Sequence, residues 1–240
     1  MPYTTQILKA GALIPDTLEL LLNWDEGSSI NANLKLLKQG NSLGKTTRER
    51  VKVILRILSR RYLLEEHVAR SLAKLAKSRF PASYLTPILY FFSVCADDLL
   101  RDTVLDFLSQ RRASGIVHID TEDLKRELQN WITQGKIKDE WSGSTLIKVA
   151  RSLLATLRDF GVLHGAANKT LAPIHLPIEA FAYIAYYLKT KTSSGDLLLK
   201  NHLWGIYFLT PGDVERLLVQ ADQMHLSVVR AFRTHRAKNE

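Results

Sequence analysis

The amino-acid sequence predicts a mainly α protein, a compact multi-helix chain with a basic N-terminal helical domain and a C-terminal winged-helix-like helical domain. Apolar side chains recur at the three- and four-residue spacing of amphipathic helices along most of the 240 residues. Ser, Thr or Asp caps and Gly or Pro stops separate these segments. A boundary near Gly115 divides the chain into domains at residues 1–115 and 116–240.

The first half is expected to contain four strongly patterned segments. Thr46 and Glu49 have the spacing of a capping box, which predicts a helix beginning there and continuing to about Tyr62. The inward side chains of this helix are Val51, Ile54, Leu55, Leu58 and Tyr62, with Val53 and Ile57 behind them. A second helix is predicted over residues 65–79, a buried apolar helix or turn over 84–96, and another helix over 97–112.

The second half is expected to contain a winged-helix-like unit at residues 119–176. Asp120 caps a predicted helix that ends at Gly135, and a longer helix follows over residues 144–160. Two short apolar pieces, 162–164 and 173–176, could pair as a hairpin, which gives the order helix, helix, hairpin. Two further helices are predicted at residues 177–188 and 211–224.

The net charge of +9 comes from one stretch of the sequence. Residues 38–79 hold twelve Lys and Arg against three acidic residues, and the remainder of the chain is neutral. On the helix capped by Thr46, basic side chains recur every four residues from Arg48 to Arg60, a distance of ~18 Å along the helix axis. Such a localised positive field predicts a polyanionic ligand, with nucleic acid first among the candidates.

A second contact is predicted on the helix at residues 144–160, which would serve as a recognition helix. The predicted nucleic-acid-binding residues are Lys45, Arg48, Lys52, Arg56, Arg60, Arg61, Arg70, Lys74, Lys77, Ser144, Thr145, Lys148 and Arg151. The alternatives are a solvated face for the basic helices and a plain amphipathic core helix for residues 144–160. The basic tail, Arg230 to Lys238, is either another electrostatic contact or a frayed terminus.

No catalytic residue, metal site or cofactor is expected. The segment from Gly40 to Thr46 resembles a phosphate-binding loop, but only three residues separate its glycines where four are required. The histidines lack metal-ligand spacing, and Cys95, the single cysteine, has no disulfide partner. The longest apolar stretch, residues 84–96, is shorter than the ~20 residues of a membrane span. We therefore expect a cytoplasmic protein without membrane contact.

Three segments resemble the BrxA family of bacteriophage-exclusion (BREX) systems. They are the opening region from Tyr3-Thr4 to Trp24, the capped basic helix from Asn41-Ser42-Leu43 to Arg61, and Trp141-Ser142-Gly143-Ser144-Thr145 through Leu163. The resemblance extends to about residue 190. It implies a helical, non-enzymatic DNA-binding protein that works beside a larger defence complex, with a fold similar to that of helical RNA-binding antitermination factors.

The sequence thus predicts a BREX-type defence component that binds double-stranded DNA through phosphate contacts with little sequence specificity. Two alternatives stay open: an assembly protein that docks an acidic partner among other BREX defence proteins, and an RNA-binding protein. The sequence defines no oligomeric state.

Overall fold

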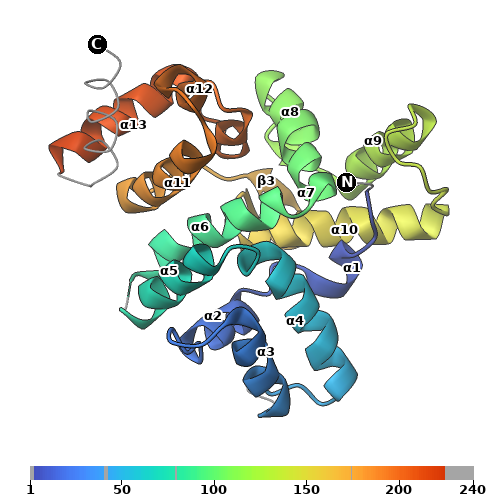
Figure 1. Ribbon diagram of the computed structural model, residues 1–240. Coiled ribbons are helices and arrows are strands. Elements are labelled where there is room, and N and C mark those ends of the chain that lie inside the picture. The colour runs from blue at the N-terminus through green and yellow to red at the C-terminus, as the bar shows by residue number, and fades with distance from the viewer. Residues whose placement is uncertain (1–2, 41–42, 79, 174, 225–240) are drawn as a thin grey trace.

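The computed structural model describes residues 3–40, 43–78, 80–173 and 175–224. Within these ranges the chain is mainly α, as the sequence predicts, and its short strands form one small sheet (Figure 1). The predicted basic tail after residue 224 lies outside the described residues.

The N-terminal half is helical throughout its described elements. In order they are α1 (Ile7–Ala10), α2 (Ile14–Leu22), α3 (Ile30–Gln39), α4 (Arg48–Tyr62), α5 (Glu66–Lys77), α6 (Ala82–Cys95), α7 (Asp98–Asp102), the π-helical segment η1 (Thr103–Leu108) and α8 (Ser109–Ala113). The C-terminal half contains β1 (His118–Ile119), α9 (Thr121–Thr133), α10 (Gly143–Asp159), β2 (Leu163–His164), β3 (Lys169–Leu171), α11 (Ile178–Lys191), α12 (Gly195–Leu199), the 3-10 helix η2 (His202–Tyr207) and α13 (Pro211–Gln223).

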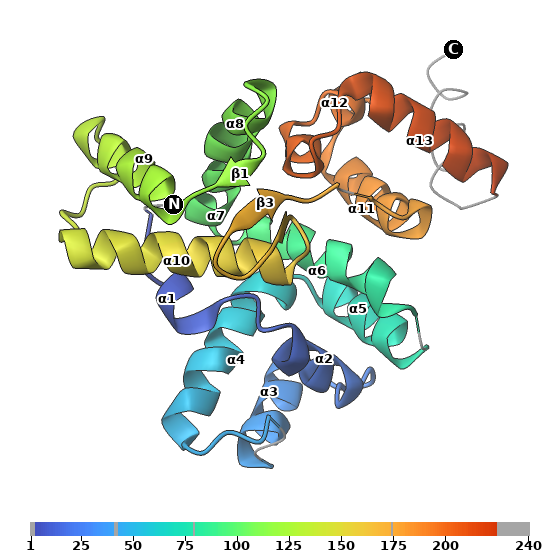
Figure 2. The same ribbon diagram turned by 180° about the vertical axis from the view of Figure 1, so that it is seen from behind.

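Helix α6 lies in the middle of the fold. Its apolar residues leave no polar face, and a helix of this kind must be covered on all sides. The buried residues are Leu85, Ile88, Leu89, Tyr90, Phe91, Phe92, Ser93 and Val94. Helices α4, α7 and α11 pack against it. In both views α2, α3 and α4 lie on one side of α6, and α11, α12 and α13 lie on the other (Figures 1 and 2).

The start of α4 differs from the prediction by one residue. Thr47, not Thr46, is the N-cap, and its hydroxyl accepts a hydrogen bond from the backbone N–H of Arg50 at 3.2 Å. With Thr47 as the cap, Arg50 occupies the position where a capping box needs a carboxylate or amide. Glu49 pairs instead with Lys52, at 3.1 Å.

The other predicted helices are observed with small shifts at their ends. Asp120 is an N-cap as predicted, Asp97 and Thr210 are also N-caps, and Thr210 forms a capping box with Asp213. The helix predicted over 97–112 is observed as α7, η1 and α8 in direct succession.

The predicted hairpin forms with a different second strand. β2 pairs with β3 at residues 169–171, not with residues 173–176, and β3 also pairs with β1, so that the antiparallel sheet has the order β1-β3-β2. Pro173 has no N–H to donate to a strand ladder, whereas the N–H of Ala172 still donates to the Val162 carbonyl. Helix, helix and hairpin are therefore present at 119–176, and the winged-helix-like assignment of this unit stays a prediction.

Buried side chains connect the two halves of the chain. α1 contacts α10, α6 contacts α11, and η1 contacts η2, so one continuous core crosses residue 115. The division into two domains at that point stays a prediction.

Glu65 joins the start of α5 to α11, and its replacement is expected to weaken this junction. Its carboxylate accepts hydrogen bonds from the Tyr187 hydroxyl at 2.8 Å and from Lys191 Nζ at 2.6 Å. Glu65→Gln removes the charge but keeps the shape, and should lower the free energy of unfolding by about 1 kcal/mol. Urea denaturation at neutral pH measures the effect. Glu66→Gln is the control, because its carboxylate makes an exposed pair with Arg70 at 3.5 Å.

The contribution of Glu65 should depend on pH in a defined direction. The hydrogen bond from Lys191 lowers the pKa of Glu65 from its ordinary value of 4.5. Its stabilisation is therefore present above pH 4.5 and is lost as the pH falls through the lower pKa of the folded state. A stability difference between wild type and Glu65→Gln that persists unchanged to the lowest pH would contradict this assignment.

Gly165 is required by the turn between β2 and β3. Its φ is +88°, and a Cβ at this position would lie 2.0 Å from the Asn168 carbonyl oxygen. Gly161 has a similar φ of +81° but open space around it. Gly161→Ala should therefore cost about 1–2 kcal/mol of stability, and Gly165→Ala about 3 kcal/mol or more, as measured by urea denaturation. Equal losses in the two variants would show that the close contact does not matter.

Candidate nucleic-acid interface

Helix α4 presents a row of basic side chains, Arg48, Lys52, Arg56 and Arg60, called here the α4 ridge. The first three are exposed, and Arg60 is half-buried. Lys52 pairs with Glu49 on the preceding turn. Among the described residues, neither Arg48 nor Arg56 has a carboxylate within ion-pair distance. These two guanidinium groups therefore face solvent with their charge uncompensated by the described part of the chain.

Helix α1 borders one side of the α4 ridge. The guanidinium of Arg60 donates to the side-chain carbonyl of Gln6 at 2.6 Å, and that of Arg50 donates to the backbone carbonyl of Lys9 at 2.8 Å. Arg50 is exposed but was not among the predicted contact residues. Its sequence position, two residues after Arg48, gives no sign of this backbone contact. The hydrogen bonds limit the freedom of both arginines and hold α1 against α4.

Arg61 does not belong to the surface on which the sequence placed it. The residue is only 6% exposed, and its guanidinium donates to the Ala12 carbonyl at 3.3 Å. Each helical residue turns by 100°, which directs Arg61 inward while Arg60 stays at the edge. Burial raises the pKa of Asp97, and the positive charges of Arg61 and Arg60 act in the opposite direction. Arg61 thus supports the fold beneath the ridge.

Lys45 is also engaged within the chain. Its ammonium group lies 2.6 Å from the Asp16 carboxylate, and the carboxylate is largely covered. This pair ties the segment before α4 to α2.

The basic row of α5 is separate from the α4 ridge. Arg70, Lys74 and Lys77 are exposed, as predicted. However, Lys74 and Lys77 both lie 3.8 Å from the carboxylate of Glu26, and Arg70 lies 3.5 Å from that of Glu66. Helix α5 packs on α2. Helices α4 and α5 diverge from the short segment that joins them, and α2 and α3 lie between them (Figure 1). The two rows therefore do not form one continuous ridge, and the α5 row is partly neutralised.

Helix α10 presents a second exposed stripe. Ser144, Lys148 and Arg151 lie on one face of the helix and are exposed. Thr145 is half-buried, and its hydroxyl lies 3.0 Å from that of the N-cap residue Ser142. The Ser144 hydroxyl also lies 3.0 Å from that of Ser142, so both Ser144 and Thr145 are engaged by the helix cap.

The N-terminal segment connects the two candidate surfaces. Helix α1 contacts both α4 and α10 and lies between them in Figure 1. Before α1, the Tyr3 ring stacks on Trp131 of α9 with a centroid distance of 6.0 Å, and its hydroxyl donates to Asp102. The segment thus touches α4, α7, α9 and α10.

The described residues contain neither a cluster of metal-ligating side chains nor a membrane-spanning helix. No three His, Cys, Asp or Glu side chains come together there as a possible metal-binding group. Among the helices described, none has both the length and the apolar character needed to cross a bilayer.

The fold and site define a class: a mainly α protein with a basic helical surface beside a small unit of two helices and a hairpin. A model of the BrxA family matches residues 1–186, so the chain belongs to the BrxA family. Membership of this family implies a component of a BREX phage-defence system. No curated protein matches the chain.

Arg61 and Arg56 should differ sharply in their effect on stability. Arg61→Ala leaves the Ala12 carbonyl without its donor and removes one of the two positive charges that act on the buried Asp97. It should lower the free energy of unfolding by about 1–3 kcal/mol. Arg56→Ala removes an exposed side chain and should change it by less than about 0.5 kcal/mol. Urea denaturation of both variants measures the difference. Similar values for the two would contradict the buried role of Arg61.

Proposed function

We propose that this BrxA-family protein is a non-enzymatic DNA-binding component of a BREX system, which holds duplex DNA mainly through phosphate contacts. The observation that carries the proposal is the exposed pair Arg48 and Arg56 on the α4 ridge, which has no carboxylate partner among the described residues. On α5, by contrast, the carboxylate of Glu26 lies 3.8 Å from both Lys74 and Lys77 and partly neutralises them.

The geometry of the ridge suits a row of phosphates. Arg48 and Arg56 are eight residues apart, which corresponds to ~12 Å along the helix axis, and Lys52 lies midway between them. Arginine binds phosphate through two parallel N–H donors, and each neutralised phosphate releases bound counterions. The ridge therefore favours contacts with successive phosphates of one strand.

Helix α10 supplies the second proposed contact. In a winged-helix-like unit the second helix enters the major groove with its N-terminal half, which on α10 would present Ser144, Lys148 and Arg151. Most of the proposed contacts are to phosphates, which carry no sequence information, so sequence preference should be low. We also propose that other BREX proteins bind this protein while it holds DNA.

Duplex binding should be strong in low salt and depend on the α4 ridge. Fluorescence anisotropy of a labelled duplex of about 20 base pairs should give a log–log salt slope of about −4 or steeper. The double variant Arg48→Ala/Arg56→Ala should weaken binding to all sequences alike and reduce the slope by about 2, since about 0.9 counterions are released per phosphate contact. Arg216→Ala on α13 is the control, because this exposed arginine already pairs with Asp213.

The same assay decides between the alternatives. Unchanged affinity in the double variant would remove the α4 ridge from the interface. Equal or tighter binding of an RNA duplex would favour RNA as the ligand. No nucleic-acid binding even at low salt would assign the basic surface to an acidic protein partner, which pull-down with purified BREX proteins after nuclease treatment would identify.

A further inference from the structure

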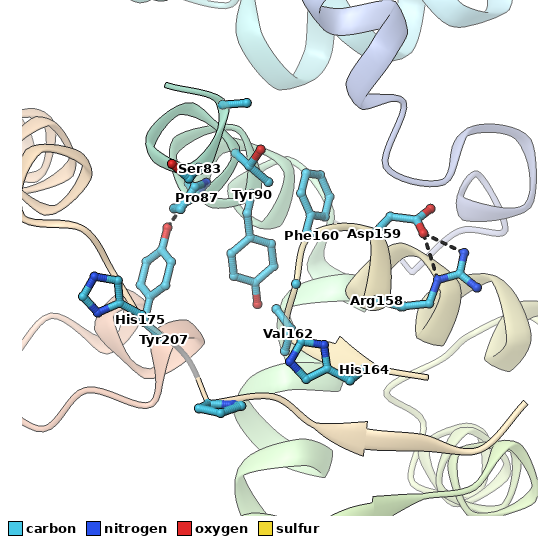
Figure 3. Close-up of a pocket in the computed structure, with 14 residues that line it drawn as sticks. Ser83, Pro87, Tyr90, Arg158, Asp159, Phe160, Val162, His164, His175 and Tyr207 are labelled. Atoms are coloured by element: carbon cyan, nitrogen blue, oxygen red, sulfur yellow. Dashed lines mark hydrogen bonds and ion pairs between the residues drawn. The ribbon is translucent and has the colours of Figure 1, made fainter. Parts of the chain in front are cut away.

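A cavity of about 570 Å³ lies where α6 begins and α10 ends. Its walls come from the first turns of α6, the end of α10, strand β2, the segment after β3, and Tyr207 of η2 (Figure 3). It is distinct from the α4 ridge and from the N-terminal half of α10. Its volume falls in the range typical of small-molecule sites.

The inner wall is aromatic and rigid. The Tyr90 ring packs against Phe160 and Tyr207, with centroid distances of 5.4 and 5.6 Å. The Tyr207 hydroxyl donates to the Pro87 carbonyl at 2.8 Å, and the Tyr90 hydroxyl donates to the Ile206 carbonyl at 3.3 Å. Burial raises the pKa of both tyrosines, so the hydroxyls stay uncharged. The wall is therefore fixed and neutral, and the planes of the Phe160 and Tyr207 rings are inclined to that of Tyr90 by 45° and 83°.

The rim carries exposed groups that form hydrogen bonds. In Figure 3, His175 and His164 lie on opposite sides of the Tyr90 ring, and both are exposed to solvent. Arg158 also lines the cavity, but its guanidinium is paired with Asp159 at 2.7 Å. The rim thus offers two imidazole rings and little net charge, which does not suit a bare inorganic anion.

We propose that this cavity binds a nucleobase. A planar heteroaromatic ring can stack on tyrosine, phenylalanine or histidine, and its polar edges need donors and acceptors of the kind that imidazoles supply. The cavity combines the aromatic inner wall with the two exposed imidazoles at its mouth. The base could come from a free nucleotide or from an unpaired position in a nucleic-acid strand, and only the second source rests on the proposed DNA-binding function.

The two sources can be tested with one fluorescent base. The probes are 2-aminopurine riboside 5′-monophosphate and a short single-stranded oligonucleotide with one central 2-aminopurine, whose fluorescence falls when the base stacks on an aromatic ring. The double variant His164→Ala/His175→Ala removes only exposed side chains and should keep the melting temperature of the wild type. Its affinity for the probe, measured from the quenching, should be lower than that of the wild type by about fivefold or more. His67→Ala on α5, outside the cavity, is the matched control.

If the wild type quenches the free nucleotide and the double variant does not, the cavity is supported as a binding site for a nucleotide. If the wild type quenches the oligonucleotide but not the free nucleotide, and the double variant quenches neither, the cavity is supported as a binding site for an unpaired base. Absence of quenching with both probes, or quenching that the double variant leaves unchanged, would overturn the inference. Duplex anisotropy measured on the same samples reports the proposed function separately, because the α4 ridge contributes no residue to the cavity.

Discussion

The burial of α6 on every side over residues 88–94 is the constraint on which the rest of the structure depends. A helix without a polar face requires partners all around it, and α4, α7 and α11 supply them from both halves of the chain. Two tyrosines tie α4 and η2 to α6: the Tyr62 hydroxyl lies 2.8 Å from that of Ser93, and the Tyr207 hydroxyl donates to the Pro87 carbonyl. With its apolar sides committed to this core, α4 can present only its basic side to solvent.

The helices from α4 to α11 and α13 could be predicted from the sequence because their signals are local, whereas α1, α2, α3 and α12 were not predicted. Caps such as Asp120 and Thr210 act within one turn, and apolar periodicity reports which side of a helix is buried. The errors concern choices that local pattern leaves nearly equal. Thr46 and Thr47 are both suitable N-caps for α4. The partner strand of β2 is predicted at residues 173–176, which begin at Pro173, but it lies at residues 169–171.

The candidate site could be predicted only in part, since charge is visible in a sequence and pairing is not. The α4 ridge and the α10 stripe are where periodicity placed them. The carboxylates of Glu26 and Asp16 come from distant segments, so the partial neutralisation of α5 and the engagement of Lys45 needed the structure. The inward turn of Arg61 toward Ala12 likewise depends on where α1 packs. The aromatic cavity joins residues from 82 to 207 and has no contiguous signal.

The contact of α1 with both α4 and α10 fixes the spacing between the two basic surfaces. Two sites on a flexible tether sample many separations, whereas two sites on one core keep a single distance and angle. A strand held at the first surface would therefore reach the second at a constant effective concentration. Under the proposed function, the protein would favour nucleic acids whose backbone path and bending match this fixed separation, and base sequence would matter less.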